Sequence, residues 1–190
     1  MDALTGTLTP LNSNLIKERF GSYGVNVLVQ DSELRIASLF SLVNDQPVTR
    51  SLAVVNYQNC DDLQVAVVHQ HIVDGGSIGQ SFVDHGFAVV KDTTALVELP
   101  VDSAFDTLYE MMRLNSPVPL AYHTYQLNVR KDGEWIAYAK VTEVHSPEHL
   151  TIDGLVERFG DDAFLGNEDP GTTDVLRKFS GFISQRVRSA

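Results

Sequence analysis

The sequence predicts an α+β fold: an antiparallel sheet of about six strands, with inserted helix-turn-helix flaps and C-terminal helices. Three observations lead to this class. Runs rich in Val, Leu, Ile and Phe follow one another across short turns, as in a meander. The segments Leu120–Arg130 and Glu134–His145 flank Asp132-Gly133, a sequence typical of hairpin turns. Segments with helical periodicity interrupt the strands in groups, whereas a doubly wound parallel sheet alternates strand and helix.

Size and charge limit the kinds of protein this chain can be. Its 190 residues, 43% of them hydrophobic, suit one domain with a buried core. Residues 1–11 show little periodicity and predict a loose leader, so we expect a single domain over 12–190 whose C-terminal helical segment is 150–190. No apolar run approaches the ~20 residues that a membrane-spanning helix needs. A formal charge of −11 disfavours nucleic acid and anionic membrane surfaces as partners.

The redox and targeting signals predict a cytoplasmic protein. Cys60 is the single cysteine of the sequence, so it has no partner for an internal disulfide. The first ten residues lack the basic start and apolar run of a signal peptide.

Local patterns predict one helix and three strands in the first third of the chain. Asn12 or Ser13 is placed to cap a helix over Leu15–Phe20, and Gly21 ends it. Three runs rich in branched and aromatic residues predict strands over Val25–Val29, Leu34–Val43 and Val48–Tyr57. The turn sequence Asn44–Pro47 joins the last two strands as an antiparallel pair.

A pair of short helices is predicted next. The segment Asp61–Val73 is ambiguous, because its valines favour a strand, whereas its apolar spacing after an Asp-rich start favours the helix that we predict. Gly75-Gly76 then breaks the chain. Ser77 is placed to cap a helix over Ile78–His85. The pair is expected to form a flap, although glycine breaks between helices more often supply turn geometry alone.

The second half continues with strands and helices. Two short strands are predicted, Phe87–Val90 and Ala95–Leu99, and then an amphipathic helix over Ala104–Leu114. The Asp-Gly hairpin described above follows. Helices over Thr151–Phe159 and Thr173–Arg188 complete the chain.

Glu143, near the end of the last strand, is the candidate catalytic residue. If the hairpin turns through a two-residue loop, Tyr122 lies opposite Glu143, and Glu143 shares a face with Trp135, Ala137 and Ala139. A carboxyl group on such an apolar face can act as a general acid or hydrogen-bond a bound anion. The alternative is a solvated carboxylate at a strand end.

The sequence predicts neither a metal site nor a cofactor. His69 and His71 are two residues apart, which places them on different faces of the predicted helix. His145 and His149 are four apart, but Pro147 between them disfavours a helix through both. The glycine-rich nucleotide-binding and phosphate-binding motifs and the serine-hydrolase elbow are absent from the sequence.

Three segments in order carry a resemblance to a known family: Leu42–Pro47 followed by a strand, Gly76–Gly79 opening a helix, and the hairpin that ends in Thr142–Pro147. Their order resembles that in chorismate lyase and in the related ligand-sensing domains of bacterial regulators, over roughly Leu15–Pro147. The resemblance implies a six-stranded antiparallel sheet with two helix-turn-helix flaps over an internal ligand cavity. It also implies that the cavity glutamate falls on Glu143.

The resemblance implies substrate-binding residues as well. The apolar flap residue falls on Ile78. Apart from the resemblance, Tyr122 and His123 on the last hairpin are candidates for hydrogen bonds to the ligand, although aromatic and histidine side chains on a strand more often pack in the core. The two anion-binding arginines of the family fall near Ala37 and Leu52, where this sequence has no charge.

Arg35 and Arg50 each lie two residues before those positions. Either they are the true equivalents and bind a carboxylate, or they are ordinary surface arginines on strand edges.

Taken together, these features predict a small-molecule cavity protein that binds an aromatic or cyclic carboxylate. As an enzyme it would be a carbon–oxygen lyase that eliminates pyruvate from chorismate or a relative, with Glu143 assisting proton transfer. The alternatives are a non-catalytic ligand-sensing or carrier module and a protein–protein interaction domain.

The predicted last helix carries basic side chains, Arg177, Lys178, Arg186 and Arg188. They can pair with the acidic loop of the same chain or with a second copy in a homodimer, although the apolar side chains of this helix favour simple packing on the body of the protein.

Overall fold

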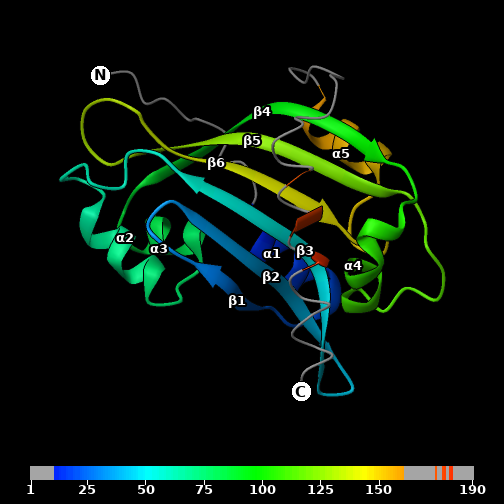
Figure 1. The fold of residues 1–190 in the computed structure, drawn as a ribbon. Coiled ribbons are helices and arrows are strands. Elements are labelled where there is room, and N and C mark those ends of the chain that lie inside the picture. Colours follow the sequence, from blue (N-terminus) through cyan, green and yellow to red (C-terminus); the bar gives the residue numbers. More distant parts are fainter. Residues whose placement is uncertain (1–10, 161–173, 175–176, 179, 182–190) are drawn as a thin grey trace.

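An open, six-stranded antiparallel sheet forms the body of the protein (Figure 1). The computed structural model describes residues 11–160, 174, 177, 178, 180 and 181. Within the sheet the strands lie in the order β1-β2-β3-β6-β5-β4, and every neighbouring pair is antiparallel. The predicted α+β class is therefore confirmed.

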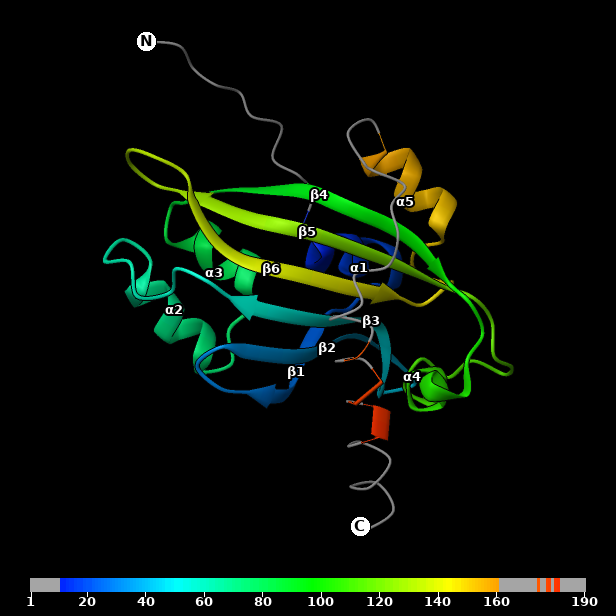
Figure 2. The same cartoon turned by 45° about the horizontal axis from the view of Figure 1, so that its top comes forward.

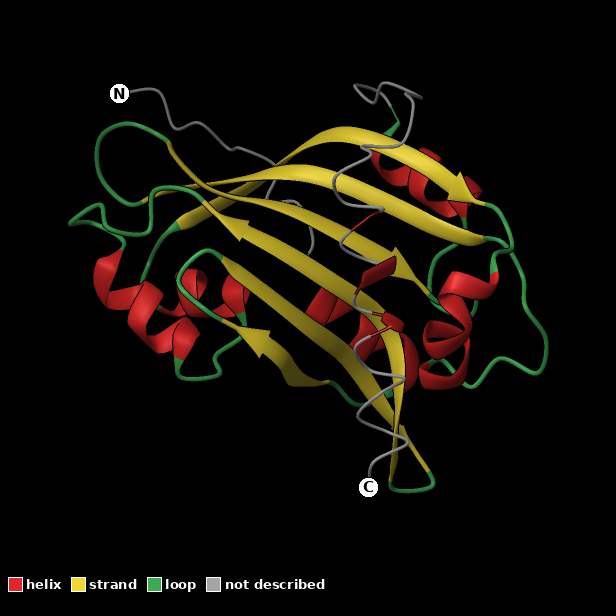
Figure 3. Cartoon of the chain, viewed as in Figure 1, coloured by secondary structure: helices red, strands yellow, loops and turns green. Residues whose placement is uncertain are grey.

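Strands and helices come in groups along the chain (Figure 3). The strands are β1 (Gly24–Gln30), β2 (Leu34–Val43), β3 (Gln46–Tyr57), β4 (Ala88–Leu99), β5 (Leu120–Arg130) and β6 (Ile136–His145). The helices are α1 (Asn12–Phe20), α2 (Ala66–Val73), α3 (Ile78–Asp84), α4 (Asp106–Met111) and α5 (Ile152–Phe159), with a short 3-10 turn, η1 (Ser103–Phe105), before α4. The grouping is typical of an α+β fold.

One face of the sheet, called the cavity face here, presents Ala53, Val55 and Val141 toward the helix pair α2–α3. The helices contribute Ile72 and Phe82, both fully buried, to the same core. Helix α1 covers the middle of this face, behind the sheet in the view of Figure 1. Helices α1, α2 and α3 therefore pack on the cavity face.

The opposite face, called the outer face, has a separate core. Here Leu52, Tyr122 and Val144 pack against Leu108 of α4. Figure 2 shows α4 at one end of the sheet and α5 beside β4 and β5. Unlike α4, helix α5 packs on the cavity face, where its Leu155 clusters with Leu96 and Ala121. Because neighbouring strand residues point to opposite faces, strands such as β3 and β5 contribute to both cores.

Turn chemistry explains two of the chain reversals. Asn44 and Asp45 form the two-residue loop between β2 and β3, with φ angles of 51° and 60°. Asn and Asp are the side chains that tolerate this left-handed region best after glycine. Gly21 ends α1 with φ 76°, and its N–H donates to the Lys17 carbonyl, as expected for a helix that stops at glycine.

The prediction of two strands between residues 87 and 99 was wrong. Phe87–Val90 and Ala95–Leu99 are not two strands but parts of the single strand β4. A β-bulge between Thr93 and Ala95 lets β4 keep its pairing with β5 through the intervening polar residues. The polar residues Lys91–Thr94, which separate the two predicted strands, are thus part of β4.

Two predicted helices are shorter in the structure. The segment Asp61–Val73 is helical, as predicted, only from Ala66 onward, and turns precede it. The segment Ala104–Leu114 divides into η1 and the short helix α4. Asp102 accepts a hydrogen bond from the Ala104 N–H at the start of η1.

The C-terminal prediction falls mostly outside the described residues, as do residues 1–10 and the end of the predicted last helix with Arg186 and Arg188. Where the chain is described, Arg177 lies 3.7 Å from the Asp102 carboxylate, so it pairs with the body of the protein. Among the described helices, none combines the length and the apolar character that crossing a membrane requires.

Candidate functional site

A cavity lies between the cavity face of the sheet and the helices α1 and α3. Its free volume is about 70 Å³, and because one buried water needs roughly 10–15 Å³, it has room for a small organic molecule. The strands supply a mostly apolar lining from Val25, Ala37, Leu39, Ala53, Val55, Leu127 and Val141. Ile78 and Gly79, at the start of α3, line the helical side with Leu11. The predicted flap residue Ile78 is therefore part of the cavity wall.

Arg35 brings a buried positive charge to this cavity. It lies on β2 opposite Val55, lines the cavity and is 1% exposed. Its Nη1 donates a 2.7 Å hydrogen bond to the Ile72 carbonyl. Among the described residues, no carboxylate lies within ion-pair distance of its guanidinium. A buried charge without a counter-ion is costly, so this position favours an anion in the cavity.

Lys91 contributes a second cation from β4. Its Nζ lies 3.7 Å from Glu143 Oε2, and both side chains are 6% exposed. The same ammonium stands 4.5 Å from the centre of the Tyr125 ring, in a cation–π contact. Lys91 and Tyr125 both line the cavity. The ammonium is thus held between a carboxylate and an aromatic face.

Glu143 points into the cavity from β6 and is 5% exposed, so the solvated strand end is the wrong alternative. Its Oε1 accepts a 3.1 Å hydrogen bond from Asn12 Nδ2. Burial first, and then the neighbouring Glu143 carboxylate, raise the pKa of the Tyr125 phenol well above its usual value. The Glu143 side chain is therefore surrounded by groups that can donate to it: an amide, an ammonium and a phenol.

Asn12 was predicted as a cap of α1, but its side chain forms hydrogen bonds with buried residues of other elements instead. The N-cap position is Leu11, with no side-chain hydrogen bond. Asn12 Nδ2 also donates to Ser51 Oγ at 3.0 Å, and its Oδ1 lies 2.6 Å from His149 Nε2. These contacts fix the orientation of the amide, so α1, β3 and the segment after β6 all hold the Asn12–Glu143 contact in place.

Three buried histidines, His123, His145 and His149, lie close to Glu143. Burial lowers the pKa of His123 to about 3 and that of His149 to about 4, against the opposing effect of the Glu143 carboxylate in both cases. Burial also lowers the pKa of His145 well below its usual value. All three rings are therefore neutral at pH 7.

These histidines predict a loss of stability in mild acid. In the unfolded chain a histidine titrates near pH 6.5, whereas in the folded protein these three stay neutral. Below pH 6.5 the unfolded state binds more protons, so the free energy of unfolding falls by up to about 1.4 kcal/mol per pH unit per histidine. Urea unfolding at pH 8, 7, 6 and 5 measures this. A His149→Asn variant should show a shallower slope, and equal stability at pH 8 and pH 5 would contradict the assignment.

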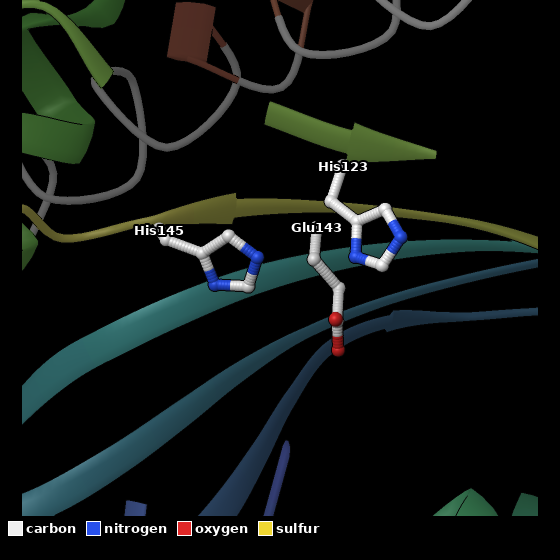
Figure 4. Close-up of side chains that lie close together, drawn as sticks. All are labelled: His123, Glu143 and His145. Atoms are coloured by element: carbon white, nitrogen blue, oxygen red, sulfur yellow. The ribbon is translucent and has the colours of Figure 1, made fainter. Parts of the chain in front are cut away.

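His123, Glu143 and His145 also form the arrangement most suited to a metal ion among the described residues. Each offers one ligand atom, and these atoms lie within 4.8 Å of one another (Figure 4). The sequence analysis tested only pairs of histidines close together in the chain. This cluster was missed because it joins His123 of β5 to Glu143 and His145 of β6.

Tyr122 was placed on the wrong face by the sequence. His123 and not Tyr122 pairs with Glu143, and Tyr122 pairs with Val144 in the core of the outer face. A β-bulge causes the difference, because the register near the turn fits a two-residue loop but shifts by one between Leu127 and Asn128.

The same bulge changes which residues share a face at the start of β6. The extra residue of the bulge is Tyr138, between Ala137 and Ala139 in the pairing. Ile136 and Tyr138 consequently pack in the core of the cavity face, where the sequence had placed Trp135 and Ala137. The hairpin loop also extends over residues 131–135, with φ 86° at Gly133.

The two arginines differ in their surroundings. Both are buried, at 1% and 3% exposure, so neither is an ordinary surface arginine. Arg50 is not among the residues that line the cavity. Its guanidinium pairs with Glu148, donates from Nε to Ser41 Oγ at 2.8 Å and lies 3.9 Å from the centre of the Phe20 ring. Arg50 thus has its partners within the protein, whereas Arg35 faces the cavity.

Sequence reasoning missed Lys91, Tyr125, Tyr23 and Asn12, which all line the cavity. A signal for Lys91 was present, because Phe87, Val89 and Lys91 alternate as one face of a strand does. His123, although predicted as a ligand contact, lies beside Glu143 and is not among the lining residues. Its Nε2 is 3.0 Å from Thr93 Oγ1.

Comparison with known proteins gives no family assignment. No protein-family model matches the chain, and no curated protein matches it significantly.

Proposed function

We propose that the cavity binds a small monocarboxylate with an apolar ring, as in 4-hydroxybenzoate. The observation that carries this proposal is Arg35, a buried guanidinium that lines the cavity with no carboxylate partner among the described residues. A carboxylate is the planar anion that an arginine binds best through paired hydrogen bonds. The apolar lining suits the ring of such a ligand.

The charges of the cavity favour a single negative charge on the ligand. Arg35 and Lys91 contribute two positive charges, and Glu143 contributes one negative charge. One carboxylate would balance the remaining positive charge, so a monocarboxylate is the ligand that these charges favour. This balance supports a binding or carrier role for an aromatic acid.

A thermal-shift titration tests this proposal. At about 100 times its dissociation constant, 4-hydroxybenzoate is expected to raise the melting temperature by about 5–10 °C, because it binds only the native state. The neutral analogue 4-hydroxybenzyl alcohol should give little or no shift, since it lacks the group that Arg35 binds. Equal shifts with both compounds, or no shift with any aromatic acid, would refute the carboxylate site.

A second candidate function, a carbon–oxygen lyase acting on chorismate or a relative, is favoured by the position of Glu143. Its carboxylate lines the cavity and accepts from Asn12, which is a suitable place for a group that assists proton transfer to a bound substrate. The six-stranded antiparallel sheet, the α2–α3 flap and Ile78 in the wall support the same proposal.

Incubation with chorismate separates the two functions. Release of pyruvate by the wild-type protein and its loss in Glu143→Gln, with 4-hydroxybenzoate binding retained, would assign the lyase reaction to Glu143. Binding without turnover would leave the carrier function.

A further inference from the structure

We propose that His123, Glu143 and His145 form a site for one divalent transition-metal ion, such as Zn²⁺ or Co²⁺. The three side chains come from the neighbouring strands β5 and β6 and are all buried. They supply two imidazoles and one carboxylate, a ligand set that suits first-row transition metals better than Mg²⁺ or Ca²⁺, which prefer oxygen alone. The inference concerns an ion and does not depend on the proposed carboxylate ligand.

His145 carries the strongest indication. Its Nδ1 lies 2.8 Å from Ser51 Oγ, whereas its Nε2 is buried and has no hydrogen-bond partner among the described residues. Figure 4 shows a ring nitrogen of His145 turned toward Glu143. A buried nitrogen without a partner is costly, and a metal ion would satisfy it.

His123 shows the same arrangement from the neighbouring strand. Its Nε2 lies 3.0 Å from Thr93 Oγ1, and its other ring nitrogen is turned toward Glu143 (Figure 4). Each histidine is therefore held at one nitrogen by a hydroxyl group and offers the other to the cluster. Metal-binding histidines have this pattern, in which an outer hydrogen bond orients the ring.

The cluster must contract to bind a metal. The ligand atoms lie within 4.8 Å of one another, whereas in a tetrahedral site with bonds of about 2.0–2.1 Å they stand roughly 3.3 Å apart. A bound ion would therefore have to draw the three ligand atoms together, chiefly through rotation of the Glu143 side chain. Because Glu143 also lines the cavity, the ion would lie beside the bound ligand.

Lys91 is the competitor of the ion. Its ammonium lies 3.7 Å from Glu143 Oε2 and balances the charge of that carboxylate. A metal ion bound to Glu143 would take over this role and repel Lys91. Removing Lys91 should therefore strengthen metal binding.

Titration of the metal-free protein, without a histidine tag, with Co²⁺ alone tests the site. We expect one ion per chain, visible d–d absorption bands typical of nitrogen and oxygen ligands, and an affinity that falls more than 100-fold in His145→Asn and in His123→Asn. His71→Asn, on α2 outside the cluster, is the matched control and should bind as the wild type does. Circular dichroism establishes that each variant is folded.

Lys91→Met provides a second, independent readout. Co²⁺ should bind it at least 10-fold more tightly than the wild type and raise its melting temperature more. Absence of stoichiometric binding to the wild type, or equal binding by His145→Asn and wild type, would overturn the inference. The carboxylate titrations are done in EDTA, which removes divalent ions. Failure of the metal site and failure of the carboxylate site can therefore be told apart.

Discussion

Arg35→Met is expected to weaken the binding of 4-hydroxybenzoate by a factor of about 100 or more, without lowering the stability of the ligand-free protein. Loss of one partner from a buried, hydrogen-bonded charge pair costs about 2–5 kcal/mol of binding free energy. In the free protein, however, Arg35 has no carboxylate partner among the described residues. Methionine removes the buried charge and keeps much of the side-chain volume, which offsets the lost hydrogen bond to Ile72.

Isothermal titration and urea unfolding measure the two quantities separately. Arg130→Met is the matched control, because Arg130 stacks on Trp135 at the end of the hairpin and does not line the cavity. It should leave the affinity unchanged. If Arg35→Met instead unfolds the protein, or binds the ligand as tightly as the wild type, Arg35 is a structural residue and not an anion site.

The second large effect is expected at the buried pair of Lys91 and Glu143. Lys91→Met should lower the free energy of unfolding by about 3–5 kcal/mol at pH 7, because it leaves the Glu143 carboxylate buried without its cation. The hydrogen bond from Asn12 remains but supplies no net charge. Guanidinium unfolding at constant pH, with metal-chelating buffer, measures the change.

The double variant Lys91→Met with Glu143→Gln should recover most of that loss, since glutamine brings no charge and can still accept from Asn12. Lys17→Met, at an exposed position of α1, is the control and should change stability by less than about 0.5 kcal/mol. A double variant as unstable as Lys91→Met would show that packing of the lysine, and not its charge, stabilises the site.

Much of the fold was readable from local sequence. The bounds of β2 and β5, the Asn44-Asp45 reversal and the stop of α1 at Gly21 agree with the prediction. These features depend on side-chain type and backbone freedom within a few residues, so neighbouring sequence suffices to determine them. Alternation along the last strand left Glu143 either on an apolar face or at a solvated strand end, and the structure places it in the cavity.

Local sequence did not determine which side chains of the last hairpin lie on which face of the sheet, nor that β4 is one strand. A single extra residue at Tyr138 in β6 places His123 opposite Glu143 and sends Tyr122 to the outer face. A second bulge, at Thr93–Ala95, keeps β4 continuous, which is why Lys91 was not expected in a strand. Bulges arise from the pairing of two strands, and the sequence of either strand alone carries little sign of them.

The sequence by itself thus determined an antiparallel α+β protein and left six candidate ligand contacts, Glu143, Arg35, Arg50, Ile78, Tyr122 and His123, of which three line the cavity. Only the tertiary structure decided that Arg35 faces the cavity while Arg50 is paired with Glu148, and that Lys91 balances Glu143. The physical reason is the separation along the chain over which each interaction acts. Periodicity and turn propensity act over a few residues, whereas the partner of a buried charge is chosen by strands and helices distant in the chain, as in Arg50–Glu148.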